Sequence, residues 1–400
     1  MEIVMKPEWI DIPVLSAVAL TSKGLASVLA PAIRGVLKPS PFGHLHFCED
    51  VSLSQAKFSQ IYPGADACFL SSRDLTSLYE SISQLEKGTR YVGVEDLGVF
   101  CCDPDQKHTG RMDGRVIIVT GGAQGFGKGI AHALLLEGAT VILADLNVDL
   151  ARETAQAFNR ELEELSAPQS VKAFNRETGS KRCMALYVDV TDETSVEALC
   201  CQVVLEYGGI DVMYSNAGIV IAGDLENMTD SKVLQVMNVN AVGYFRCAKY
   251  ASRYMKLQAA FDSSFTADIL ATSSIAGLVS YPKNYAYCAS KFAINALTQC
   301  FAKELIPYKI KVNSVCPGNY YDGPLWNDPE KGLFVQYLKA GKIPNGKTVQ
   351  DSVDFYMNRE PFHRGAQPED VALAVMYCIE QQFETGIALP ATGGLAMGRS

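Results

Sequence analysis

Short apolar runs rich in β-branched residues recur from about residue 113, and longer stretches with helical spacing separate them. The first run, Val116-Ile117-Ile118-Val119, suits a strand that is buried on both faces. Further strands are predicted at residues 140–144, 184–188, 211–215, 269–272 and 311–315. Helices are predicted at residues 130–136, 194–207, 231–255 and 287–305, in the polar stretch 147–182, and from 367–370 onward. Repeated β-α units predict an α/β fold with a Rossmann-type, doubly wound parallel sheet.

The first 112 residues do not share this pattern, because Pro7, Pro13, Pro31, Pro39, Pro41 and Pro63 divide them into short pieces. A helix is predicted at residues 73–85 and strands at 90–94 and 98–101, and the polar run 103–110 is typical of a linker. We therefore divide the chain into a small α/β N-terminal extension of unknown role, residues 1–112, and a larger α/β domain, residues 113–400.

Composition and charge narrow the classes of partner. The 400 residues carry a net charge of −9, which argues against nucleic acid or an anionic membrane as the main partner. No apolar run is long enough to span a membrane, and the start of the chain lacks the pattern of a signal peptide. The twelve cysteines show no CxxC spacing, so we expect reduced thiols and a cytoplasmic protein.

A glycine-rich loop follows the first predicted strand. It reads Thr120-Gly121-Gly122-Ala123-Gln124-Gly125-Phe126-Gly127, and a helical run and a second strand ending at Asp145 come after it. Glycines let the backbone approach a pyrophosphate, and the start of a helix offers it free N–H groups. An acid at the position of Asp145 accepts hydrogen bonds from an adenosine ribose and repels a 2′-phosphate. Because no lysine or arginine follows in Leu146-Asn147, the sequence favours NAD over NADP.

Tyr287 and Lys291 lie four positions apart, which places a phenol and an ammonium on one face of a helix. A cation about 5 Å away, at an effective dielectric constant near 20, is worth roughly 3 kcal/mol and lowers the pKa of a phenol by about two units. Tyr287 then becomes able to remove a proton from an alcohol, and Ser274, at a predicted strand end, is available to bind the same oxygen. Such a Tyr–Lys pair is common on protein surfaces, and it becomes specific only together with the dinucleotide fold.

These motifs resemble the short-chain dehydrogenase/reductase family over about residues 112–396. The resemblance rests on the glycine loop, Asp189, Asn216-Ala217-Gly218, Asn240, Ser274, Tyr287, Lys291 and Pro317-Gly318. It implies hydride transfer between NAD(P) and an alcohol/carbonyl pair, with Asn240, Ser274, Tyr287 and Lys291 as catalytic residues. It also implies a homotetramer, with residues 231–255 and 287–305 at the interface. The implied cofactor-binding residues are Gly121, Gln124, Gly125, Phe126, Gly127, Asp145, Leu146, Asp189, Val190, Asn216, Ala217, Gly218, Tyr287, Lys291, Pro317 and Gly318.

Residues 319–366 resemble the substrate lid of the sorbitol-6-phosphate 2-dehydrogenase branch of this family. Asn319 stands where the family often has a threonine that contacts the cofactor. The resemblance implies a polyol or polyol phosphate that is oxidised to the ketose, and it leaves open whether the substrate is phosphorylated. The candidate substrate residues are Lys283, Asn284, Asn319, Tyr320 and Arg364. The alternatives are a reductase of another carbonyl and a nucleotide-binding scaffold without catalysis.

The N-terminal extension contains Gly43-His44-Leu45-His46-Phe47-Cys48, which offers potential metal ligands. No third histidine has a helpful spacing, so we expect a loop or core histidine and no metal. Residues 91–102 faintly resemble the end of a class II aldolase domain, but the catalytic half of an aldolase is not visible. The extension is therefore interpreted as a structural or assembly appendage, and an aldolase-linked bifunctional enzyme is the alternative.

Overall fold

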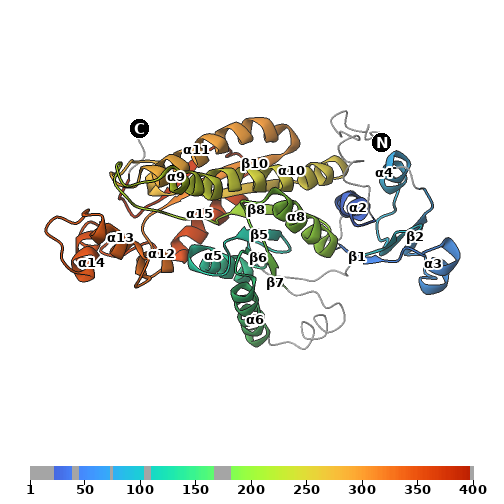
Figure 1. Cartoon of the computed structure of the whole chain (residues 1–400). Helices are drawn as coiled ribbons and strands as arrows, with labels where there is room; N and C mark the ends of the chain where they lie inside the picture. The colour runs from blue at the N-terminus through green and yellow to red at the C-terminus, as the bar shows by residue number, and fades with distance from the viewer. Residues whose placement is uncertain (1–21, 38–44, 73–74, 103–109, 166–181, 397–400) are drawn as a thin grey trace.

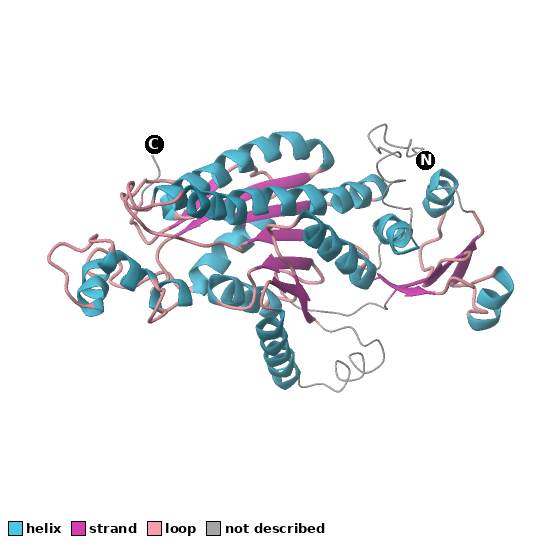
Figure 2. Ribbon diagram, viewed as in Figure 1, coloured by secondary structure: helices cyan, strands magenta, loops and turns pink. Residues whose placement is uncertain are grey.

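The computed structural model describes residues 22–37, 45–72, 75–102, 110–165 and 182–396, and these contain two sheets. The larger sheet has seven strands in the order β11-β10-β9-β8-β5-β6-β7, and all its pairings are parallel. Helices cover both of its faces (Figure 2), so the predicted Rossmann-type fold is confirmed. Its strands are β5 (Val116–Thr120), β6 (Thr140–Asp145), β7 (Cys183–Tyr187), β8 (Val212–Ser215), β9 (Ala267–Thr272), β10 (Ile310–Pro317) and β11 (Ala388–Ala391).

Alternate residues of the central strands enter two separate cores. Val116 and Ile118 belong to the core under one layer of helices, while Ile117 and Val119 belong to the core under the other. A strand between two helical layers must be apolar on both faces, which explains the uninterrupted apolar runs of the sequence. The helices of this domain are α5 (Gly125–Leu136), α6 (Val148–Leu165), α8 (Glu193–Tyr207), α9 (Asp230–Met237), α10 (Gly243–Phe261), α11 (Tyr285–Leu305) and α15 (Pro368–Glu380).

The helix predicted at residues 231–255 is interrupted. A π-helical turn, Asn238–Val242, separates α9 from α10. The side chain of Asn240 leaves this turn to bind both the N–H and the C=O of Ile219, at 2.8 and 2.9 Å. π-Turns within helices are frequent at functional sites, and periodicity alone does not reveal them. For the polar stretch 147–182, the helix ends at Leu165, and residues 166–181 lie outside the described part of the chain.

The N-terminal extension has a four-stranded sheet in the order β1-β4-β3-β2. Its predicted helix and strands are present, although residues 73–74 and most of the expected linker lie outside the described residues. The helix α2 packs against α8 and α10, and its Arg34 forms a buried ion pair with Asp211 at 2.8 Å. The elements of the extension are α2 (Ser22–Leu37), β1 (Leu45–Glu49), α3 (Gln55–Ile61), β2 (Ala67–Leu70), α4 (Leu75–Ser83), β3 (Tyr91–Val94) and β4 (Gly98–Cys102).

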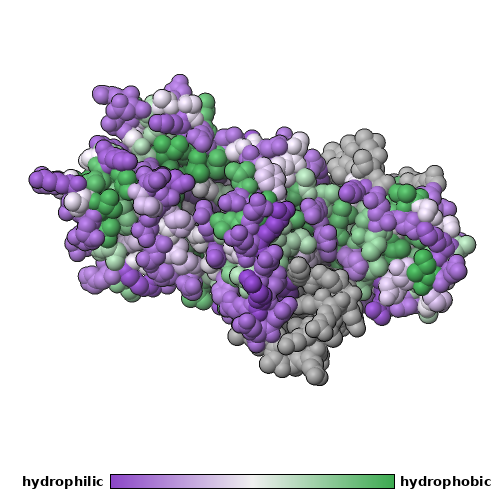
Figure 3. Space-filling model, turned by 60° about the horizontal axis from the view of Figure 1, so that its bottom comes forward, coloured by the Kyte–Doolittle hydropathy of each residue, from purple (hydrophilic) through white to green (hydrophobic). Residues whose placement is uncertain are grey.

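The predicted lid contains α12 (Pro324–Asn327), α13 (Leu333–Lys339) and α14 (Val349–Met357). These helices and the N-terminal sheet lie at opposite ends of the molecule (Figure 1). Apolar residues on the face in Figure 3 form several groups among hydrophilic ones. Among the described helices, none is long and apolar enough to cross a membrane.

Candidate functional site

A cavity of about 2160 Å³ opens beyond the carboxyl ends of the central strands. Neighbouring strands β5 and β8 lie where the strand order reverses, which is where open α/β sheets bind ligands. The wall is made by the loops after these strands, by β9, β10 and α11, and by the lid. No described residue of the N-terminal extension lines this cavity.

The glycine loop forms the wall at the start of α5. Gly121 has a φ of +65°, and a Cβ there would lie 2.9 Å from the Cα of Ala217. A Cβ on Gly127 would lie 2.1 Å from the carbonyl oxygen of Gly121, so only glycine allows α5 to approach the loop this closely. Gly127 therefore supports the loop from behind and does not itself line the cavity. This packing turns the N-terminus of α5 toward the cavity, as an anion site requires.

Two carboxylates lie at the rim of this wall. Asp145 accepts hydrogen bonds from the N–H groups of Ala123 at 3.0 Å and Asn147 at 2.9 Å, which fixes it beside the glycine loop. Asp189 accepts from the N–H of Thr191 at 2.8 Å and from its hydroxyl at 2.7 Å. All the predicted cofactor-binding residues line the cavity, apart from Gly127.

The predicted catalytic residues meet where β9 and α11 approach each other. The Tyr287 hydroxyl lies near that of Ser274, which caps the next turn by accepting from the N–H of Ala276 at 3.1 Å. Lys291 is only 3% exposed and donates to the carbonyl oxygen of Thr272 at 2.7 Å. Its ammonium nitrogen lies 5.5 Å from the centre of the Tyr287 ring. Tyr287, Ser274 and Lys291 therefore form one group on the cavity wall.

The pKa values of this group differ from the prediction. Burial raises the pKa of Tyr287 to about 12, although the neighbouring Ser274 acts in the opposite direction. Burial also lowers the pKa of Lys291 to about 8. The expectation that Lys291 alone gives Tyr287 a pKa below its ordinary value is therefore wrong. Desolvation disfavours the phenolate more strongly than its neighbours favour it, so the chain by itself holds Tyr287 as a proton donor.

Asn240 lies behind the cavity wall and does not line the cavity. In addition to Ile219, it donates to the hydroxyl of Ser290 at 2.9 Å. A Cβ on Gly218 would lie 3.3 Å from the Asn240 Oδ1 atom and 3.6 Å from the Lys291 ammonium. Asn240 thus joins the loop after β8 to α11, close to the lysine.

Three of the five predicted substrate residues, Asn284, Asn319 and Tyr320, line the cavity, and the two predicted phosphate-binding cations do not. Lys283 donates instead to the carbonyl oxygen of Ala340 in the lid. Arg364 pairs with Asp370 at the start of α15, at 2.6 Å. Both side chains are thus held by other groups, and their assignment as phosphate ligands is corrected.

Other cations on the lid do line the cavity, and sequence reasoning missed them. They are Lys331, Lys342 and Arg359. Lys342 is half-buried, its nitrogen lies 3.8 Å from the centre of the Tyr337 ring, and burial lowers its pKa to about 8. Nothing in the sequence of the lid indicates which of its charged residues face inward. That follows only from the packing of Tyr321, Trp326, Phe334 and Tyr337 in the lid core.

The lid closes over both ends of the cavity. At the glycine loop, the ring of Tyr320 packs on that of Phe126 with centroids 4.9 Å apart. At the other end, Asn284 donates to the Tyr337 hydroxyl at 2.5 Å. The Asn284 Oδ1 atom is buried, and among the described residues it has no hydrogen-bond partner. This leaves an acceptor available to a substrate hydroxyl.

Comparisons with known proteins match the dehydrogenase part of the chain. The family profile described as short chain dehydrogenase matches residues 115–328, more than half of the chain. Sorbitol-6-phosphate 2-dehydrogenase of Escherichia coli (strain K12) is 30% identical over 71% of this chain and 99% of its own. A 3-oxoacyl-[acyl-carrier-protein] reductase of Thermotoga maritima is 29% identical over 72% of this chain and 100% of its own. The crystal structure of sorbitol-6-phosphate 2-dehydrogenase from Erwinia amylovora superimposes with a TM-score of 0.60 at 28% identity, over 71% of this chain and 100% of that one.

Proposed function

Because the chain belongs to the short-chain dehydrogenase family, it is an oxidoreductase of alcohols or carbonyls, and we propose that it transfers hydride between NAD and a sugar alcohol or sugar-alcohol phosphate. Oxidation gives the ketose. The observation that carries the proposal is that Tyr287 and Ser274 lie together, beside the buried Lys291, on the wall of a cavity at the carboxyl ends of the strands.

In the proposed reaction, Tyr287 exchanges a proton with the substrate oxygen and Ser274 donates a hydrogen bond to the same atom. Bound NAD supplies the hydride acceptor, and its reduced form the donor. The raised pKa of Tyr287 supports its role as the acid in reduction. In oxidation, the Lys291 cation and the positive charge of the oxidised nicotinamide favour the phenolate. Asn240 is proposed to hold a water that continues the proton path.

The rim of the cavity supports the preference for NAD. The glycine loop and the start of α5 are proposed to hold the pyrophosphate, and Asp145 the adenosine ribose. The carboxylate of Asp145 already accepts two backbone N–H bonds and stands next to the exposed Leu146. A 2′-phosphate at this carboxylate would meet a fixed negative charge, which is unfavourable.

The chemistry of the lid supports a polar substrate. The free acceptor of Asn284, the amide of Asn319 and the hydroxyl of Tyr320 suit the hydroxyl groups of a polyol. Lys342 and Arg359 are available to bind a phosphate. A lipidic carbonyl would leave the buried Oδ1 acceptor of Asn284 without a partner, which costs free energy. These features favour the sugar alcohol over the acyl thioester of the Thermotoga reductase.

A substrate panel tests the proposal. The purified full-length protein is assayed for NADH formation with hexitols, pentitols and their phosphates, and for NADPH oxidation with lipidic ketones and acyl thioesters. We expect turnover of a polyol or polyol phosphate with NAD. Turnover confined to lipidic carbonyls with NADPH would contradict both the substrate and the cofactor.

The Tyr287→Phe variant separates an enzyme from a nucleotide-binding scaffold. It keeps the ring and loses the proton, so turnover should fall by at least about a hundredfold while NADH fluorescence still reports binding. Tyr285→Phe, which makes the same change on the same helix at a residue that does not line the cavity, is the matched control and should keep its turnover. Unchanged turnover in Tyr287→Phe would rule out the proposed chemistry.

We further propose a cytoplasmic homotetramer. Val242, Phe245 and Phe292 leave 38–44% of their surface exposed on the π-turn, α10 and α11, which supports an interface there. None of the twelve cysteines, all of which lie in the described residues, forms a disulfide, which suits a reducing compartment. Light scattering after size-exclusion chromatography tests the assembly, and Phe245→Glu should dissociate it.

A further inference from the structure

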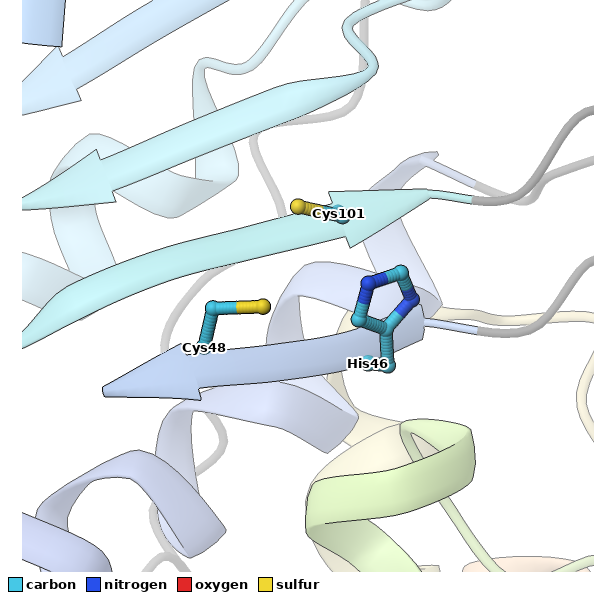
Figure 4. A group of neighbouring side chains, drawn as sticks. All are labelled: His46, Cys48 and Cys101. Carbon is cyan, nitrogen blue, oxygen red and sulfur yellow. The ribbon is translucent and has the colours of Figure 1, made fainter. Parts of the chain in front are cut away.

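Three metal-ligating side chains gather on one face of the N-terminal sheet. His46 and Cys48 are two residues apart on β1, so both point to the same face. Cys101 lies on the antiparallel neighbour β4, directly opposite His46 in the register. Figure 4 shows the three side chains together above the two strands. Their ligand atoms all lie within 4.8 Å of one another.

One side of this cluster packs against apolar residues, and the other side is exposed to solvent. Cys101 packs into a small core with Leu53, Phe58 and Val99. Tyr62, directly after α3, forms a hydrogen bond with Cys101. On the other side, Cys48 is exposed and His46 is half-buried. An ion can therefore enter from solvent, while the aromatic residues beneath restrict the movement of its ligands.

The donor atoms, two sulfurs and one imidazole nitrogen, are those that zinc prefers. Zinc–sulfur bonds of about 2.3 Å and zinc–nitrogen bonds of about 2.0–2.1 Å place tetrahedral ligand atoms roughly 3.5–3.8 Å apart. The ligand atoms here need to approach by about 1 Å at most, which side-chain rotation can supply.

We propose that His46, Cys48 and Cys101 bind one zinc ion, with a solvent molecule as the fourth ligand. From the sequence we expected no metal here, because no third histidine has a helpful spacing. Cys101 is distant from Cys48 in the sequence, and only the pairing of β1 with β4 brings it beside the other two ligands. His44, the other candidate, lies outside the described residues. The ion would join the edge strand β1 to β4 and so stabilise the extension, independently of the dehydrogenase reaction.

Cobalt substitution tests the site in the reduced full-length protein. After removal of metal by a chelator, Co²⁺ should produce a thiolate-to-cobalt charge-transfer band and the intense visible bands of a tetrahedral ion. Zinc should abolish both. Cys48→Ser should lose about half of the charge-transfer intensity, and His46→Gln should weaken zinc binding by at least about tenfold, measured against a chromophoric chelator. Cys48 is the best residue to replace first, because it is exposed and its replacement by serine should not disturb folding.

Two cysteines outside the cluster provide matched controls. Cys68→Ser changes a half-buried thiol on β2 of the same sheet, and Cys300→Ser changes an exposed thiol on α11. Both should keep the cobalt spectrum and bind as much zinc as the wild type. Equal zinc content in wild type and Cys48→Ser, or a cobalt spectrum without the charge-transfer band, would overturn the proposal. Neither result bears on the dehydrogenase reaction, which is measured separately.

Discussion

The Lys291→Met substitution should lower the activity of the protein. At neutral pH it should also remove an electrostatic cost to folding. Burial lowers the pKa of Lys291 from 10.5 to about 8, so the folded state binds this proton more weakly than the unfolded state does. At pH 7 both states are largely protonated. The ionised lysine then opposes folding by about 3 kcal/mol, at about 1.4 kcal/mol for each unit of pKa difference.

The pH dependence of stability separates the effect of the lost charge from the effect of the changed packing. Between pH 8 and 10.5 the folded state releases the proton before the unfolded state does, so the stability of the wild type rises with pH in this window. By pH 9.5 the penalty falls to about 1.5 kcal/mol. The lost hydrogen bond to Thr272 also alters the stability of the variant, but to first order it does so equally at both pH values.

Urea denaturation of both proteins at pH 7 and pH 9.5 measures the effect. We expect the wild type to gain roughly 2 kcal/mol relative to Lys291→Met between the two pH values. Lys303→Met, on the exposed face of the same helix, should show no such relative change. A stability difference that is constant with pH, or one that grows in the opposite direction, would refute the assignment of Lys291 as a buried cation.

Three further variants test the ion pair, the cofactor preference and the lid. Arg34→Met leaves the carboxylate of Asp211 buried without its cation and should cost about 3–5 kcal/mol of unfolding free energy in urea, most of it recovered in the double variant with Asp211→Leu. Asp145→Ser should raise kcat/KM with NADP relative to NAD by about tenfold or more, since it removes a charge worth about 1–2 kcal/mol there. Lys342→Ala should raise KM for a polyol phosphate about tenfold and leave the free polyol unaffected, whereas Lys339→Ala, exposed on the lid, should change neither.

Predictions from the sequence succeeded where a local pattern determines the structure. The strand β5 is apolar throughout because it lies between two helical layers, and Gly121 is required because a Cβ there would meet Ala217. The strand β11 was not predicted, because it is only four residues long and includes Pro390. The inward direction of Lys342 was missed for a different reason: it depends on how the lid helices pack, which no short stretch encodes.

The described part of the N-terminal extension contacts the helical layer and lines no part of the cavity. Its helix α2 covers α8 and α10, and Arg34 reaches through to Asp211, which also accepts the N–H of Val116 at 2.8 Å at the start of β5. One buried carboxylate thus connects the extension to the first strand of the nucleotide-binding sheet. A buried ion pair of this kind restricts how the two parts can pack, because any other arrangement leaves a charge without its partner. The extension therefore contacts the larger domain at the end opposite the lid (Figure 1), and we propose that it is a structural appendage and not a second catalytic centre sharing the dehydrogenase cavity.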